Sequence, residues 1–298
     1  MAESLLDLSE LLPSWLITLR GERKSPSTVK AYRSGVQAFI DYCAAQGIPA
    51  DLTKANVVSF MAYLSDREPA TARLRLTAVK LFARWLADEE GFNADPIQAV
   101  RAPKLDQRVV AHLTENEVRA LLRACDGGEL RDKRDKALVS LFVETGMRAE
   151  EMLALTVGDV SIADCSVTVV RGKGAKGRKS KFSAQTAAAL DRYMRARRKE
   201  GHPAQEGPLW LSSRGALSYS GLQHALGARA EAAGVPNFHL HRLRHSAAVR
   251  WLRAGGSESG LMAQAGWQSR HMVDRYIKSA NEELAADEFD RLNLAVEP

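Results

Sequence analysis

Apolar residues recur at helical spacing through the first hundred residues, and this periodicity limits the fold of that region more than any other feature. A first stripe follows Ser25 and Pro26 and ends at Gly47; it comprises Val29, Tyr32, Val36, Phe39, Ile40 and Cys43. Two further stripes comprise Val57, Phe60, Met61 and Leu64, and Leu74, Leu76, Val79, Phe82, Trp85 and Leu86. Such stripes are typical of helices packed against one another, so this region is predicted to be an all-α helical bundle.

The second part of the chain mixes helices with short strands. Residues 101–111 read as a linker between residues 1–100 and residues 112–298, and a chain of 298 residues is long enough for two domains. Thr114 and Glu117 have the spacing of a capping box, which predicts a helix start. Residues 167–171 and 179–182 flank a glycine-punctuated stretch and are predicted to form a small antiparallel hairpin. We therefore expect a mainly α chain whose second domain is α+β.

Composition excludes several classes of protein. With 45% hydrophobic and 26% charged residues, the chain is predicted to be globular. Its three cysteines lack metal-binding spacing, which argues against a disulfide framework or a zinc knuckle. The N-terminus lacks the basic start and long apolar run of a signal peptide, so we expect a cytoplasmic protein with no membrane partner. The net charge of +6 permits a polyanionic partner without requiring one.

Positive charge is concentrated between residues 171 and 181, a stretch that contains no acidic residue. Its six cations are Arg171, Lys173, Lys176, Arg178, Lys179 and Lys181. This pattern fits either a phosphate-binding surface or a solvated basic loop, and charge alone does not decide between them. The same two alternatives apply to Lys30 and Arg73 on the N-terminal helices, which are candidates for contacts with a DNA backbone.

The stretch HLHRLRHS, residues 239–246, gathers imidazole and guanidinium groups. On a helix, His241, Arg244 and His245 share one face. Two histidines four residues apart resemble a metal pair, yet no carboxylate occurs between residues 237 and 253, so the electrostatics favour an anion such as phosphate. Histidines that only form hydrogen bonds inside the fold remain an equally good explanation of this stretch taken alone.

Four motifs in order carry a family resemblance. ETGMRAEE contains Arg148, GKG contains Lys173, HLHRLRH contains His241 and Arg244, and GWQSRHMVDRY ends at Tyr276. This series, spanning about residues 114–278, resembles the tyrosine recombinase, or phage integrase, family, which includes site-specific integrases and chromosome-dimer resolvases. The N-terminal helices are similar to the family's core-binding domain in length and character only. The resemblance implies that residues 112–298 form the catalytic domain.

The resemblance also implies roles for individual residues. Arg148 and Arg244 would hold the scissile phosphate, and His241 would join them. Tyr276 would attack the phosphorus and form a 3′-phosphotyrosine link, while Lys173 would protonate the leaving 5′-oxygen. Lys176 is a weaker alternative for that acid, and Arg171, Lys176 and Arg178 are predicted DNA contacts.

Three further residues are assigned by the same comparison. Trp267 stands where many relatives have histidine, and its indole N–H can donate to a phosphate oxygen but cannot transfer a proton at neutral pH. Glu151 is expected to orient Arg148, and His245 is a supporting residue. The other tyrosines of the chain, Tyr219 among them, lack a comparable motif.

The implied activity is site-specific DNA recombination. Four copies of the chain would assemble on double-stranded DNA that carries specific recombination sites, and would exchange strands through a Holliday junction. An accessory protein, the target sequence and the biological role are left open. The tail offers Ala285, Phe289 and Leu292 on one helical face, for docking on its own domain or on a neighbour. Neither cofactor nor metal is expected, because the arginines take the place of a divalent cation.

Three other functions compete with recombination. A type IB topoisomerase would use the same chemistry without a partner site. A DNA-binding protein on a recombinase scaffold would have lost catalysis, and Trp267 would be its first sign. A metal-dependent nuclease is disfavoured because the required carboxylates are missing.

Overall fold

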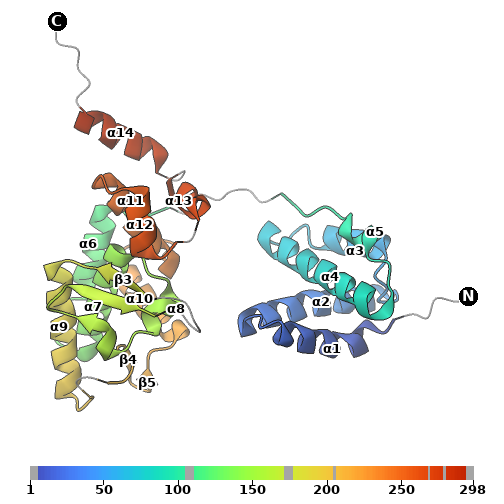
Figure 1. The fold of residues 1–298 in the computed structure, drawn as a ribbon, viewed down its shortest axis with the longest axis horizontal. Helices are drawn as coiled ribbons and strands as arrows, with labels where there is room; N and C mark the ends of the chain where they lie inside the picture. The colour runs from blue at the N-terminus through green and yellow to red at the C-terminus, as the bar shows by residue number, and fades with distance from the viewer. Residues whose placement is uncertain are drawn as a thin grey trace, which may run out of the picture. The chain divides into compact units, whose positions relative to one another are not determined.

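The computed structural model describes residues 6–104, 111–170, 177–203, 206–267, 269–277 and 280–292. The chain forms two compact units, residues 1–107 and residues 108–298 (Figure 1). The helices of the first unit are α1 (Leu8–Gly21), α2 (Pro26–Gln46), α3 (Lys54–Tyr63), α4 (Pro69–Glu90) and α5 (Asp95–Gln98). The first unit is thus the predicted helical bundle, with α2 packed along α4.

Local sequence signals fix the ends of α2. The Ser25 hydroxyl accepts a hydrogen bond from the backbone N–H of Thr28, and Pro26 occupies the first turn. Gly47 ends the helix in the left-handed conformation. Phe39, from the first predicted stripe, is fully buried in this unit. Leu74 is an exception, because its side chain is exposed on α4.

The second unit contains nine further α-helices and two small sheets among its described residues. The helices are α6 (Glu115–Ala124), α7 (Leu130–Thr145), α8 (Ala149–Leu153), α9 (Ala184–Lys199), α10 (Tyr219–Ala232), α11 (Leu240–Arg253), α12 (Glu258–Ala265), α13 (Arg270–Ile277) and α14 (Asn281–Leu292). The strands are β1 (Val160–Ser161), β2 (Ser166–Val169), β3 (Arg178–Lys181), β4 (Leu211–Ser212) and β5 (Gly215–Ala216). The fold is therefore mainly α with α+β in the second unit, as predicted.

The predicted hairpin is present between β2 and β3. These strands pair antiparallel, with Val167 opposite Ser180 and Val169 opposite Arg178, and β1 adds a third strand beside β2. Residues 171–176, the predicted tip of the hairpin, lie outside the described residues. No helix in the described part of the chain is long and apolar enough to cross a membrane.

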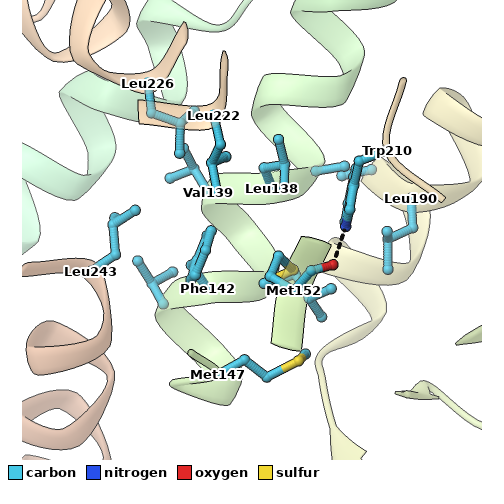
Figure 2. Close-up of a cluster of buried hydrophobic side chains, with 14 of the residues drawn as sticks. Leu138, Val139, Phe142, Met147, Met152, Leu190, Trp210, Leu222, Leu226 and Leu243 are labelled. Carbon is cyan, nitrogen blue, oxygen red and sulfur yellow. Dashed lines mark hydrogen bonds between the residues drawn. The ribbon is translucent and has the colours of Figure 1, made fainter. Parts of the chain in front are cut away.

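Helix α7 runs through the core of the second unit. Figure 2 shows Leu138, Val139 and Phe142 of this helix among side chains from α9, α10 and α11. The Trp210 indole N–H donates a hydrogen bond of 2.9 Å to the Met152 carbonyl, so this large side chain is buried without leaving its polar atom unpaired. This core fixes the turns at both ends of α8 and the start of α11.

Phe142→Ala should lower the free energy of unfolding by about 3–5 kcal/mol, the usual cost of deleting a buried phenyl ring. Phe142 is only 1% exposed and lies in the core of the second unit. Phe289→Ala is the matched control, because Phe289 is 61% exposed and its loss should change stability by less than about 0.5 kcal/mol. Urea unfolding of the three proteins measures both effects, and equal losses would contradict this packing.

Candidate active site

The turn between α7 and α8 brings Arg148 to the surface of the second unit. Gly146 ends α7 with φ of 59°, a left-handed conformation that a side chain would strain. Arg148 directly precedes α8, and its backbone N–H donates a hydrogen bond of 2.9 Å to Glu151 Oε2. The Arg148 side chain remains 44% exposed. The TGMR sequence therefore folds into a helix start that presents a guanidinium group.

Helix α11 places the other two predicted phosphate ligands beside Arg148. His241 is exposed, whereas Arg244 is only 3% exposed. Arg244 Nη1 donates to the Gly146 carbonyl and, at 3.1 Å, to the Ala265 carbonyl. Arg148, His241 and Arg244 all line one pocket, together with Met147, Ala149, Glu150, Tyr219 and Leu240. The structure thus brings Arg148 together with two residues of α11, a helix that is distant from it in the sequence.

Trp267 supports Arg244 from the side of α12. The Arg244 guanidinium carbon lies 5.1 Å from the centroid of the Trp267 ring, a cation–π distance. Trp267 is buried in a small apolar cluster with Ala248, Leu261 and Val273. Because Val273 belongs to α13, the helix that carries Tyr276 packs against α11 and α12. Helix α13, which carries Tyr276, therefore lies beside the helix of His241 and Arg244.

Glu151 lies between two arginines. Arg178 donates to both of its carboxylate oxygens, at 2.9 and 2.8 Å, and Arg148 Nη1 donates to Oε1 at 3.2 Å. Burial by itself raises the pKa of Glu151, but the hydrogen bonds from Arg178 and Arg148 outweigh it and bring the pKa from 4.5 to about 2. Glu151 therefore stays ionised and orients cations.

The depressed pKa of Glu151 predicts an acid-dependent contribution to stability. A carboxylate whose pKa falls on folding stabilises the native state above its ordinary pKa, and this contribution is lost as the pH falls toward the folded value. Parent protein should therefore be more stable than Glu151→Gln at neutral pH, and the difference should shrink between pH 4.5 and about 2. Melting temperatures of both proteins across this range measure it. A constant difference would contradict the assignment.

Several predicted residues lie outside what the structure describes. Arg171, Lys173 and Lys176 fall within residues 171–176, and the Tyr276 side chain is likewise not described. Lys30 and Arg73 are exposed on α2 and α4 of the first unit. The roles given to all these residues remain predictions.

Arg178 differs from the solvent-exposed DNA contact that its basic sequence context predicts. Its side chain is 13% exposed, and its guanidinium group is directed at Glu151. The alternation of side chains along a strand could have revealed that Arg178 points inward, because Arg178 and Ser180 occupy one face of β3. Ser180 is buried on that face, whereas Lys179 and Lys181 are exposed on the other. The described end of the basic run, residues 178–181, is thus divided between an inner and an outer face.

The opposite face of α11 anchors the start of the second unit. Arg242 donates to the Ala111 and His112 carbonyls, at 3.0 and 3.2 Å, and forms a 3.5 Å ion pair with Glu117. His245 is buried, and its ring lies 6.3 Å from that of His112, outside the set of residues that line the pocket. Arg242 and Arg244 are two residues apart, so a helix directs them to different sides. One arginine is structural and the other belongs to the candidate site.

Tyr219 is a pocket residue that its sequence context does not reveal. It opens α10, is exposed, and lines the same pocket as Arg148, His241 and Arg244. No motif surrounds it, so only the fold reveals that the Tyr219 phenol belongs to this pocket. Within the described ranges, no group of three or more histidine, cysteine or acidic side chains is arranged to hold a metal ion.

Comparison with known proteins identifies the family. The sequence profile of the phage integrase family matches residues 111–283, and that of the phage integrase N-terminal SAM-like domain matches residues 11–91. The chain is 31% identical over 258 residues to tyrosine recombinase XerC of Roseiflexus sp. (strain RS-1), covering 83% of this chain and 82% of the relative. It is 28% identical to tyrosine recombinase XerC of Bacillus subtilis (strain 168), covering 87% and 88%.

Solved structures show the same fold. The chain matches XerH site-specific recombinase bound to palindromic difH substrate with a TM-score of 0.74 and 18% identity, covering 94% of this chain and 84% of that one. It matches a lambda integrase dimer bound to a COC′ core site with a TM-score of 0.70 and 19% identity, covering 90% and 76%.

The chain belongs to the phage integrase family. It is a tyrosine recombinase, an enzyme of site-specific recombination that breaks and rejoins DNA.

Proposed function

We propose that the pocket between α8 and α11 binds the scissile phosphate of double-stranded DNA and that Tyr276 is the nucleophile. The observation that carries this proposal is the meeting of Arg148, His241 and Arg244 in one pocket, beside the helix that contains Tyr276. Guanidinium groups present planar forks of donors that match phosphate oxygens. Two guanidinium groups next to a histidine therefore suit phosphoryl transfer, and they fit this reaction better than they fit hydrolysis at a site built on carboxylates.

Cleavage then follows from the groups present. The Tyr276 phenol oxygen bonds to phosphorus, the bond from phosphorus to the 5′-oxygen breaks, and the 3′-phosphate remains attached to the tyrosine. The phenol proton passes to His241, and the leaving 5′-oxygen takes a proton from Lys173. Because the phosphotyrosine bond conserves the energy of the phosphodiester, attack by a 5′-hydroxyl from another strand reseals DNA without ATP.

The two arginines have different settings. Arg244 is buried and fixed by the Gly146 and Ala265 carbonyls and by the Trp267 ring, so its direction is set before substrate arrives. Arg148 is more exposed and is steered by Glu151. Arg244, which is held rigidly, and Arg148, which Glu151 orients, would together stabilise the charge that develops on the equatorial oxygens of one phosphate.

The first unit would supply binding to the DNA backbone. We propose residues 1–100 as the core-binding domain, residues 101–111 as the linker and residues 112–298 as the catalytic domain. Lys30 and Arg73 are exposed on α2 and α4, where phosphate contacts would cost no core packing. Because these contacts release counterions, binding should weaken steeply as salt increases.

Strand exchange requires several copies, and α14 offers a surface for their contact. Within the chain, α14 is held by ion pairs of 2.8 Å from Arg253 to Glu283 and to Asp287. Phe289 and Leu292 nevertheless remain exposed on it. We propose a homotetramer on two cytoplasmic DNA sites, with exchange through a Holliday junction. Solved relatives include a lambda integrase tetramer bound to a Holliday junction.

The test is recombination between two candidate sites by purified protein in EDTA. The proposal predicts recombinant DNA and resolution of a synthetic Holliday junction with no added metal. Relaxation of supercoiled DNA without any recombinant product would instead identify a topoisomerase. Recombination that appears only after a cell extract is added would show that an accessory protein takes part.

A further inference from the structure

Arg178 makes the strongest contact to Glu151 in the candidate site. It donates two parallel hydrogen bonds, of 2.9 and 2.8 Å, whereas the Arg148 side chain donates one of 3.2 Å to the same carboxylate. A bidentate pair between arginine and carboxylate is stronger and more directional than a single contact. Glu151 is therefore held mainly by Arg178, and the Arg148 side chain makes the weaker contact with the same carboxylate.

Arg178 is itself fixed on its other side. Its Nε donates 3.3 Å to the Gln264 carbonyl at the end of α12, and the Ser180 hydroxyl donates 2.8 Å to the same oxygen. The Gln264 side chain also pairs with the Lys181 backbone, accepting from its N–H and donating to its carbonyl at 3.1 and 2.6 Å. Strand β3 is thus joined to α12 directly behind Glu151.

Gly266 leaves the space that this arrangement needs. A β-carbon at this position would overlap the Arg178 guanidinium group, and the Gly266 φ of 68° disfavours any side chain. The Gly266 carbonyl also accepts a long, 3.5 Å hydrogen bond from Arg148 Nη1. The Arg148 side chain is therefore guided by two long contacts, with Glu151 Oε1 and the Gly266 carbonyl, while Arg178 makes the shorter, bidentate contact with Glu151.

We propose that Arg178 is a positioning residue that engages Glu151 and so keeps Arg148 available to the scissile phosphate. Without Arg178, Glu151 would lose its bidentate partner and keep only its contacts with Arg148, whose backbone N–H already donates to Oε2. A full ion pair between the Arg148 side chain and Glu151 would then compete with the phosphate for that guanidinium group. This inference rests on the proposed function, because it assigns Arg148 to the phosphate. It gives Arg178 a role that reaches DNA only through Glu151.

The proposal makes a prediction about combined substitutions. Arg178→Gln should slow cleavage roughly tenfold, a size typical of coupled neighbours. Glu151→Gln removes the competing carboxylate, so Arg178→Gln combined with Glu151→Gln should cleave no more slowly than Arg178→Gln alone. Arg178→Lys keeps the positive charge but loses the pair of donors that makes the bidentate contact with Glu151. Its cleavage rate should therefore lie between those of the parent and Arg178→Gln.

The measurement is single-turnover cleavage of a nicked suicide substrate at saturating protein, with DNA affinity and melting temperature recorded for each variant. Arg192→Gln, an exposed arginine on α9, controls for loss of one positive charge. Destabilisation alone would make the double variant slower than either single variant, so a double variant that cleaves no more slowly than Arg178→Gln separates positioning from folding. If Arg178→Gln does not fold, Arg178→Lys and its combination with Glu151→Gln provide the same comparison.

Two results would overturn the inference. One is cleavage at the parent rate by the Arg178 variants, and the other is losses that simply multiply in the double variant. A parent protein that forms no adduct on any tested site would instead overturn the proposed function, so the two failures are distinguishable.

Discussion

Tyr276→Phe should abolish the covalent protein–DNA adduct and all strand cleavage while leaving DNA affinity nearly unchanged. The substitution removes only the phenol oxygen, which is the atom proposed to bond to phosphorus. The helix that carries residue 276 packs against α11 and α12, and a phenyl ring preserves its helical propensity. Denaturing gels of suicide-substrate reactions measure the adduct, and band shifts measure binding.

Tyr219→Phe is the matched control for this prediction. It deletes the same atom from the other tyrosine of interest, which lines the pocket with Arg148 and His241. The Tyr219 variant should form adduct, because the family resemblance assigns the nucleophile to the GWQSRHMVDRY motif. An adduct that survives Tyr276→Phe but disappears with Tyr219→Phe would reverse the two roles.

Arg148→Gln should reduce the cleavage rate on the order of a hundredfold or more, as removal of a transition-state donor does elsewhere. Arg148 faces the pocket with a half-exposed side chain, so its loss should change stability little. DNA affinity should fall much less, because the backbone contacts proposed for other residues would still hold the duplex. Single-turnover rates at saturating protein separate these effects, with Arg192→Gln as the control for charge.

An equal loss of affinity and rate would contradict this role for Arg148. That result would make it an ordinary contact with ground-state DNA, because uniform binding does not raise the rate of the chemical step. Arg244 is less suitable for this experiment. It is buried against the Gly146 and Ala265 carbonyls, so replacing it also leaves those acceptors unpaired.

Helical periodicity predicted most of the fold because side chains on one helix face must share one environment. The exception, Leu74, shows the limit of that argument. Leu74 and Leu76 are two residues apart, so a helix cannot turn both toward the same core, and only Leu76 is buried. The hairpin was predicted from its strand-like runs and glycines. The third strand of the same sheet, β1, has only two residues, which is too short for a detectable pattern.

The candidate site was predictable only where a motif marks its residues. Arg148, His241 and Arg244 lie in ordered motifs, and the fold brings them to one pocket. Tyr219 carries no local signal. The contacts of Arg178 with Glu151 and of Trp267 with Arg244 join elements distant in sequence, and charge pattern alone cannot show which cation meets which carboxylate.

The central claim, that Tyr276 forms the covalent bond to DNA, is tested most directly by mapping the attached nucleotide. The adduct would be trapped on a suicide substrate in EDTA, digested with nuclease and trypsin, and analysed by mass spectrometry. We expect the nucleotide mass on the peptide of residues 276–278, which contains only one tyrosine. A modified peptide of residues 215–229, which contains Tyr219, or a nucleotide on any other peptide would contradict the claim.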